Sequence, residues 1–153
     1  MIRAGDVDGG LREGEVAMRY SPSDSDSVIA VVGELDKLGK KAEADAFYQK
    51  HSAPYRALCE GHPNSAQAHN QLAWTQAKCR RDLDDALAHA KRAVELEPKN
   101  TACIDTLAET YFQRGDVQNA IETMNKCAEL EPNEKRHQQQ LERFNKALRG
   151  GKQ

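Results

Sequence analysis

The chain has 153 residues, of which 39% are apolar and 30% are charged, so it can form one compact domain or a short stack of repeats. No run of about 18 apolar residues occurs, so no segment is predicted to span a membrane. The net charge is −2 but uneven, because six basic side chains and a single acidic one lie from Lys135 onward, after an acidic body.

Four prolines recur along the chain at nearly constant spacing. Pro22, Pro63, Pro98 and Pro132 are separated by 41, 35 and 34 residues, and the last two end the similar phrases AVELEP and CAELEP. Proline lacks the backbone N–H of a helical residue and disfavours helical geometry in the residue before it. Each proline is therefore predicted to close a helix, and the spacing predicts an internal repeat of about 34 residues.

The first predicted helix covers about residues 6–20 and contains Gly9, Gly10 and Gly14. Each glycine costs roughly 1 kcal/mol relative to alanine, so this helix is expected to be the least stable element. In the phase of the repeat it is a second helix, and its first helix would precede Met1. We therefore expect the chain to be a piece of a longer protein.

Residues 25–63 are predicted to form a helix pair that is seven residues longer than the last one, with the excess after Ala44. Seven residues are close to two helical turns, so a longer second helix would keep its face in register. Pro54 lies inside this stretch and indicates a kink or a break instead. The sequence leaves both alternatives open.

A short turn is predicted between the two helices of a pair, with a small residue five positions later. These turns and small residues are Gly5-Asp6 with Gly10, Arg81-Asp82 with Ala86, and Gly115-Asp116 with Ala120. Glycine allows a positive φ at the end of the first helix, and aspartate can cap the second. The small residue allows the two helices to approach closely. Cys127 matches Ala93 of the preceding unit and is expected to be a buried packing residue.

A final helix is predicted over about residues 134–148, where Leu141, Phe144 and Leu148 recur at three- and four-residue spacing. One apolar stripe with a polar back is typical of a helix that caps a repeat stack. The predicted boundaries are a truncated repeat and linker at 1–24, helix pairs at 25–63, 64–98 and 99–132, a capping helix at 133–149 and a flexible tail at 150–153.

The sequence resembles the tetratricopeptide repeat family over about residues 5–148, and some phrases look like a bacterial subset of it. The last unit matches at Ile104, Leu107-Ala108, Tyr111, Gly115-Asp116, Ala120, Met124 and Pro132. The middle unit matches at Leu72-Ala73, Asp82, Ala86, Ala93 and Pro98, but has His69 and Gln76 where large aromatic residues usually occur. The earlier unit matches less well, at Val31, Leu35, Gly39, Ala44 and Tyr48. The resemblance implies an all-α right-handed superhelix, an α-solenoid of about three helix-turn-helix units.

In the resembled family the first helix of each pair lines a concave groove that binds a peptide or a partner protein. Matching positions imply groove contacts from Asn70, Trp74, Lys78, Asp105, Glu109, Phe112, Gln113, Arg136 and Arg143. Trp74 and Phe112 can belong to the groove or to the core, and the sequence leaves this open. Because Asp105 and Glu109 would repel a carboxylate, a basic or mixed-charge segment is expected to fit this groove best.

No catalytic pattern occurs in the sequence, so we expect a protein-binding scaffold that is not an enzyme and needs no cofactor or metal. The four cysteines form no CxxC motif. A set of Cys59, His62, His69 and Cys79 would have to converge from diverging elements, which argues against zinc. Nucleic-acid and membrane partners are not expected. The chain would be cytoplasmic if it is complete, and its compartment is otherwise open.

Two other classes of function are compatible with the sequence. Self-association through an exposed face of the first helix would make the chain a homo-oligomer. The chain could instead be the regulatory carboxy-terminal tail of a larger multidomain enzyme.

Overall fold

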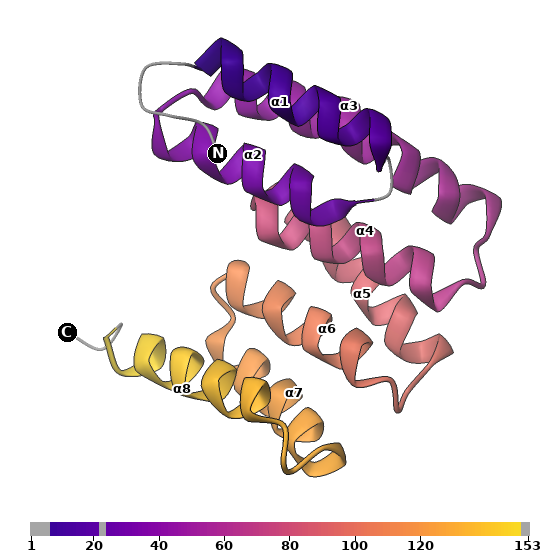
Figure 1. Cartoon of the computed structure of the whole chain (residues 1–153). Helices are drawn as coiled ribbons and strands as arrows, with labels where there is room; N and C mark the ends of the chain where they lie inside the picture. Colours follow the sequence, from indigo (N-terminus) through magenta and orange to yellow (C-terminus); the bar gives the residue numbers. More distant parts are fainter. Residues whose placement is uncertain (1–6, 22–23, 151–153) are drawn as a thin grey trace. The chain divides into compact units, whose positions relative to one another are not determined.

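The computed structural model describes residues 7–21 and 24–150, with side chains from Gly9 onward. These residues form eight α-helices and no strand, which confirms the predicted all-α fold (Figure 1). The chain divides into two compact units, residues 1–61 and 62–153. The predicted turn at Gly5-Asp6 and the predicted helix end at Pro22 lie outside the described residues.

The first unit contains three helices, α1 (Val7–Tyr20), α2 (Ser25–Lys37) and α3 (Lys41–Gly61). Helix α2 packs against both α1 and α3. Its Val28, Val32 and Leu35 recur at four- and three-residue spacing and are completely buried, so they form the apolar face of α2 inside this unit.

Helix α3 runs through Pro54 without a break, so the longer second helix is the alternative that the structure adopts. An interior proline removes one helical hydrogen bond and costs about 3 kcal/mol in an isolated helix. On either side of it, Phe47, Tyr48 and Tyr55 are buried. Burial of these aromatic rings offsets the cost of the proline.

The second unit contains five helices, and each packs against its neighbour along the chain; α4 also packs against α6. Their bounds are α4 (Ala66–Cys79), α5 (Leu83–Leu96), α6 (Thr101–Gln113), α7 (Val117–Leu130) and α8 (Lys135–Gly150). The small residues Ala86 and Ala120 are completely buried, as are Ala93 and Cys127. The predicted close approach of paired helices is therefore confirmed.

The turns after α2, α4 and α6 contain the same backbone hydrogen bond. In each, an N–H group donates to the carbonyl oxygen five residues earlier, near the end of the preceding helix. Its donors and acceptors are Lys40 and Leu35, Arg81 and Gln76, and Asp116 and Tyr111. Gly39 and Gly115 provide the positive φ, of 72° and 85°. The three turns therefore share this hydrogen bond, as the repeat predicts.

The turn after α4 differs because it contains no glycine and because one further residue, Asp82, follows the hydrogen-bond donor Arg81 before α5 begins. Arg80 and Asp82 both adopt the left-handed conformation there, with φ of 54° and 50°, which costs roughly 1–2 kcal/mol per residue. Asp116 caps α7 by accepting a hydrogen bond from the backbone N–H of Asn119 at 3.3 Å, as predicted. The prediction that Asp82 caps α5 in the same way is wrong, because its left-handed backbone does not bring its side chain onto the helix N–H groups.

Gly14 lets α1 approach α2 and α3 closely. A Cβ atom at this position would lie 2.8 Å from Cγ2 of Val31 and 3.2 Å from Cζ of Phe47, whereas a Cβ at Gly33 would meet no atom within 4 Å. Both glycines lie within helices, so Gly→Ala gives the same gain in helix propensity at each position.

We expect Gly33→Ala to raise the free energy of unfolding by about 0.5–1 kcal/mol and Gly14→Ala to lower it by about 1 kcal/mol. Chemical denaturation followed by far-UV circular dichroism measures both, and Gly33→Ala is the matched control. Equal stabilisation by the two substitutions would contradict the close packing of α1.

Helix α1 also exposes apolar side chains. Val16 is 49% exposed and Tyr20 is 86% exposed. An open cavity of about 490 Å³ lies between α1 and α2, lined in part by Gly10, Gly14 and Val31. Self-association through α1 stays a prediction.

Candidate ligand-binding surface

The residues expected to bind a partner lie on three helices of the second unit. They are Asn70, Trp74 and Lys78 of α4, Asp105, Glu109, Phe112 and Gln113 of α6, and Arg136 and Arg143 of α8. We call the part of the molecule that they form the α4–α6–α8 surface. On α4 and α6 most of them recur every four residues, which places them on one face of each helix.

Glu109 is the centre of the polar contacts on this surface. Its side chain is completely buried, and its carboxylate accepts hydrogen bonds from Lys78 Nζ at 3.4 Å and Gln113 Nε2 at 2.8 Å. Arg143 donates to the second carboxylate oxygen through Nη2. Glu109 thus joins α4, α6 and α8. A buried carboxylate needs such partners, because an unpaired charge in the interior is strongly destabilising.

Asp105 forms a second pair between α6 and α8. It is 4% exposed, and its Oδ2 accepts a hydrogen bond from Arg136 Nη2 at 3.1 Å. Burial raises the pKa of Asp105, and the positive charge of Arg136 opposes that effect. Asp105 therefore contributes to the contact between helices instead of presenting a charge to solvent.

The two aromatic residues of the surface are both half-buried. Phe112 stacks on the core residue Phe144, with ring centroids 4.6 Å apart, and the Arg143 guanidinium lies 4.6 Å from the Phe112 centroid. Trp74 carries Lys78 over its ring, with Nζ 5.2 Å from the centroid. Both aromatic residues therefore contribute to the interior and to the surface, so the two sequence alternatives are not exclusive.

The charge available to a ligand on this surface is positive. The side chains of Lys78, Arg143 and Arg136 are 28%, 39% and 64% exposed, whereas those of Glu109 and Asp105 are 0% and 6% exposed. The expectation of a basic or mixed-charge partner rested on accessible carboxylates. The structure contradicts that premise, because it buries both carboxylates beneath cations.

The sequence analysis missed these ion pairs, although their spacing is a usable signal. Glu109 and Arg143 are 34 residues apart, which is one repeat, and the pairs of Lys78 with Glu109 and of Asp105 with Arg136 are each 31 residues apart. Opposite charges at about one repeat length lie on neighbouring first helices of a stack. Such spacing predicts ion pairs between them.

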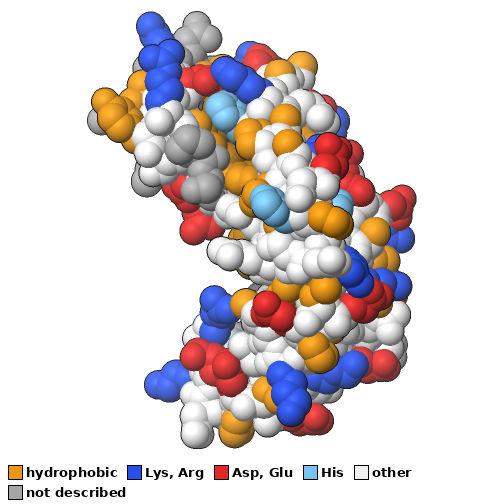
Figure 2. All heavy atoms as spheres, turned by 90° about the vertical axis from the view of Figure 1, so that its right-hand side faces the viewer, with side chains coloured by type: hydrophobic (Ala, Val, Ile, Leu, Met, Phe, Trp, Pro, Cys, Tyr) orange, Lys and Arg blue, Asp and Glu red, His pale blue; other side chains and the backbone are white. Residues whose placement is uncertain are grey.

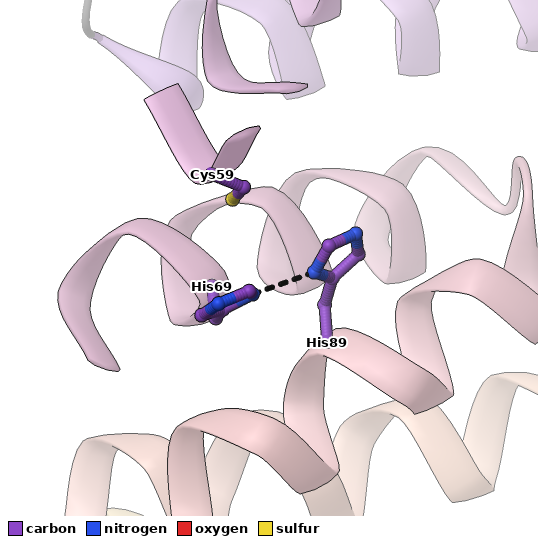
Figure 3. A group of neighbouring side chains, drawn as sticks. All are labelled: Cys59, His69 and His89. Carbon is purple, nitrogen blue, oxygen red and sulfur yellow. Dashed lines mark hydrogen bonds between the residues drawn. The ribbon is translucent and has the colours of Figure 1, made fainter. Parts of the chain in front are cut away.

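The two polar residues at aromatic positions of the middle unit are also accommodated by hydrogen bonds. Gln76 is completely buried and donates to Asp85 of α5 at 2.6 Å. His69 is 8% exposed; its Nε2 lies 3.0 Å from the carbonyl oxygen of Pro63, and its Nδ1 lies 2.7 Å from Nδ1 of His89 on α5 (Figure 3). These polar contacts replace the apolar packing expected of aromatic rings and join α4 to α5.

The buried thiols Cys103 and Cys127 are poor candidates for chemistry. Burial raises the pKa of Cys103 to about 11 and that of Cys127 to about 12. The thiolate, which is the reactive form, is therefore scarce at neutral pH. Both residues act as small packing groups, as was predicted for Cys127.

Figure 2 shows basic and acidic side chains interspersed over one face of the molecule, where the coloured residues form no large patch of a single sign. Within the described part of the chain, no helix is long and apolar enough to cross a membrane.

Residues 80–143, which extend from the end of α4 into α8, match the model of the family described as tetratricopeptide repeat. Over these residues the chain has the sequence features of tetratricopeptide repeats. No curated protein matches the sequence. A tetratricopeptide fold indicates a scaffold for protein–protein interactions, and proteins of this kind are generally not catalytic.

Solved tetratricopeptide proteins are similar in structure. TTC0263, a thermophilic TPR protein of Thermus thermophilus, is 20% identical with a TM-score of 0.61, and the match covers 94% of this chain and 74% of that one. MamA from Desulfovibrio magneticus RS-1 is 21% identical with a TM-score of 0.59, over 92% of this chain and 75% of that one.

The first TPR domain of Spaghetti (RPAP3), solved bound to the HSP90 peptide SRMEEVD, is 19% identical with a TM-score of 0.54, over 81% of this chain and 92% of that one. At these identities the likeness establishes the shared fold.

Proposed function

We propose that this tetratricopeptide repeat protein is a scaffold whose α4–α6–α8 surface binds a partner segment that carries carboxylates. The observation that carries the proposal is the distribution of charge: Lys78, Arg136 and Arg143 are accessible, and the two acidic residues are buried beneath them. A carboxylate that approaches this surface meets cations first.

Trp74 supplies the apolar part of the proposed contact. It is half-buried beside Lys78, and an aromatic residue next to a cation can hold both the apolar and the charged part of a peptide. The peptide bound to the TPR domain of Spaghetti, SRMEEVD, contains three acidic residues. That complex supports an acidic ligand class for a surface of this fold, while the partner's identity is open.

We expect the double variant Trp74→Ala/Lys78→Gln to bind a fluorescein-labelled hexaglutamate peptide at least tenfold more weakly than the unaltered chain, a loss of about 1.4 kcal/mol. The variant removes an aromatic anchor and one of the three accessible cations. Fluorescence anisotropy measures the affinity, and circular dichroism verifies that the variant is folded.

Lys126→Gln is the matched control, because it removes an equal charge from an exposed position on α7 and is expected to change the affinity less than twofold. A labelled hexalysine peptide tests the opposite ligand class. Tighter binding of hexalysine than of hexaglutamate, or equal hexaglutamate affinities for the double variant and the unaltered chain, would contradict the proposal.

A further inference from the structure

Glu109 is already paired with two of the cations that a ligand carboxylate would bind. Its two oxygens accept from Lys78 of α4 and from Arg143 of α8, on opposite sides of α6 in the order of the helices. Neither donor is buried: their side chains are 28% and 39% exposed. The surface therefore contains a carboxylate of its own, bound to the same groups as an incoming one.

A ligand cannot simply displace this carboxylate. Glu109 is completely buried, and removing its cations would leave a charged group in the interior without compensation, which is strongly unfavourable. Arg143 is held further by its contacts with the rings of Phe112 and Phe144, at 4.6 and 4.9 Å from the two centroids. A ligand must therefore bind Lys78 and Arg143 while both are paired with Glu109.

We propose that Glu109 is a specificity-determining residue that lowers the affinity of the α4–α6–α8 surface for carboxylates by neutralising Lys78 and Arg143 from within. This inference rests on the proposed function, because it concerns the same surface and the same ligand class. It implies that the unaltered chain selects ligands by apolar contact as well as by charge, since its cations are only partly available.

Glu109→Gln tests the inference because it removes the charge and keeps the shape. The amide oxygen of glutamine can still accept from Lys78 and Gln113, so the contact between α4 and α6 is retained, whereas its NH₂ group offers Arg143 no negative charge. We expect the variant to bind the labelled hexaglutamate peptide about tenfold more tightly than the unaltered chain in fluorescence anisotropy, with its helical content unchanged.

Two controls test whether the gain in hexaglutamate affinity arises from loss of the ion pair between Glu109 and Arg143. Glu122→Gln changes the net charge of the chain equally, at an exposed position on α7, and is expected to change the affinity less than twofold. If the gain arises from Arg143, the double variant Glu109→Gln/Arg143→Gln loses most of it. A gain in Glu122→Gln equal to that in Glu109→Gln would mean that total charge alone is responsible, and would overturn the inference.

The outcomes separate the inference from the proposed function. If the unaltered chain binds hexaglutamate and Glu109→Gln binds it no more tightly, the inference fails and the proposed function stands. If only Glu109→Gln binds, the masking of cations is supported, and carboxylate binding by the unaltered chain fails. If neither chain binds the peptide, both proposals fail.

Discussion

Replacing Arg143 by leucine is expected to lower the free energy of unfolding by roughly 3 kcal/mol. The substitution leaves the completely buried carboxylate of Glu109 with only the longer contact to Lys78, at 3.4 Å, and the hydrogen bond from Gln113. It also removes the cation that lies over the Phe112 ring. Urea denaturation followed by Trp74 fluorescence measures the loss, since Trp74 is the only tryptophan and lies in the second unit.

Arg149→Leu is the control for this prediction, because Arg149 is exposed near the end of α8 and its loss should change stability by less than about 0.5 kcal/mol. The double variant Arg143→Leu/Glu109→Leu also removes the buried carboxylate that had lost its partner, so part of the lost stability should return. Additive losses in the double variant would show that Glu109 is not stabilised through Arg143.

Replacing Phe144 by alanine is expected to cost about 3–5 kcal/mol. Phe144 is completely buried in a core cluster with Ile104, Met124 and Cys127, and it stacks on Phe112. Through this side chain α8 packs into the core formed by α6 and α7. A terminal helix of a repeat stack covers an apolar face that would otherwise be exposed. Urea denaturation measured through Trp74 is again the readout.

Phe144→Leu is the matched variant and should cost less than about 1.5 kcal/mol, because it keeps most of the apolar volume. If Phe144→Ala were no more destabilising than Phe144→Leu, α8 would not be anchored by the volume of this side chain. The two variants therefore separate loss of packing from loss of the aromatic ring.

Local patterns were enough to predict most of the fold. Prolines at nearly constant spacing indicated the helix pairs, and the small residues Ala86 and Ala120, five positions after each turn, are completely buried as expected. Gly115 has the positive φ and Asp116 caps the next helix. Such features depend on residues close together in the chain, which is why the sequence contains them.

Two local predictions failed or stayed open because other parts of the structure decided them. Pro54 lies inside a continuous helix, since buried aromatic residues on the same helix outweigh its unfavourable geometry. Asp82 does not cap α5 through its side chain, because its backbone is in the left-handed conformation.

The sequence by itself determined the helical repeat, its turns and the three helices that provide the candidate surface, because these follow from periodicity and from the conformations that glycine, proline and alanine allow. Only the tertiary structure decided which charges are accessible. Asp105 and Glu109 are buried because cations from neighbouring helices lie against them. The burial of a carboxylate depends on partners that lie about one repeat away in the chain. Repeat-length spacing indicates candidate pairs, but it does not specify which carboxylates become buried.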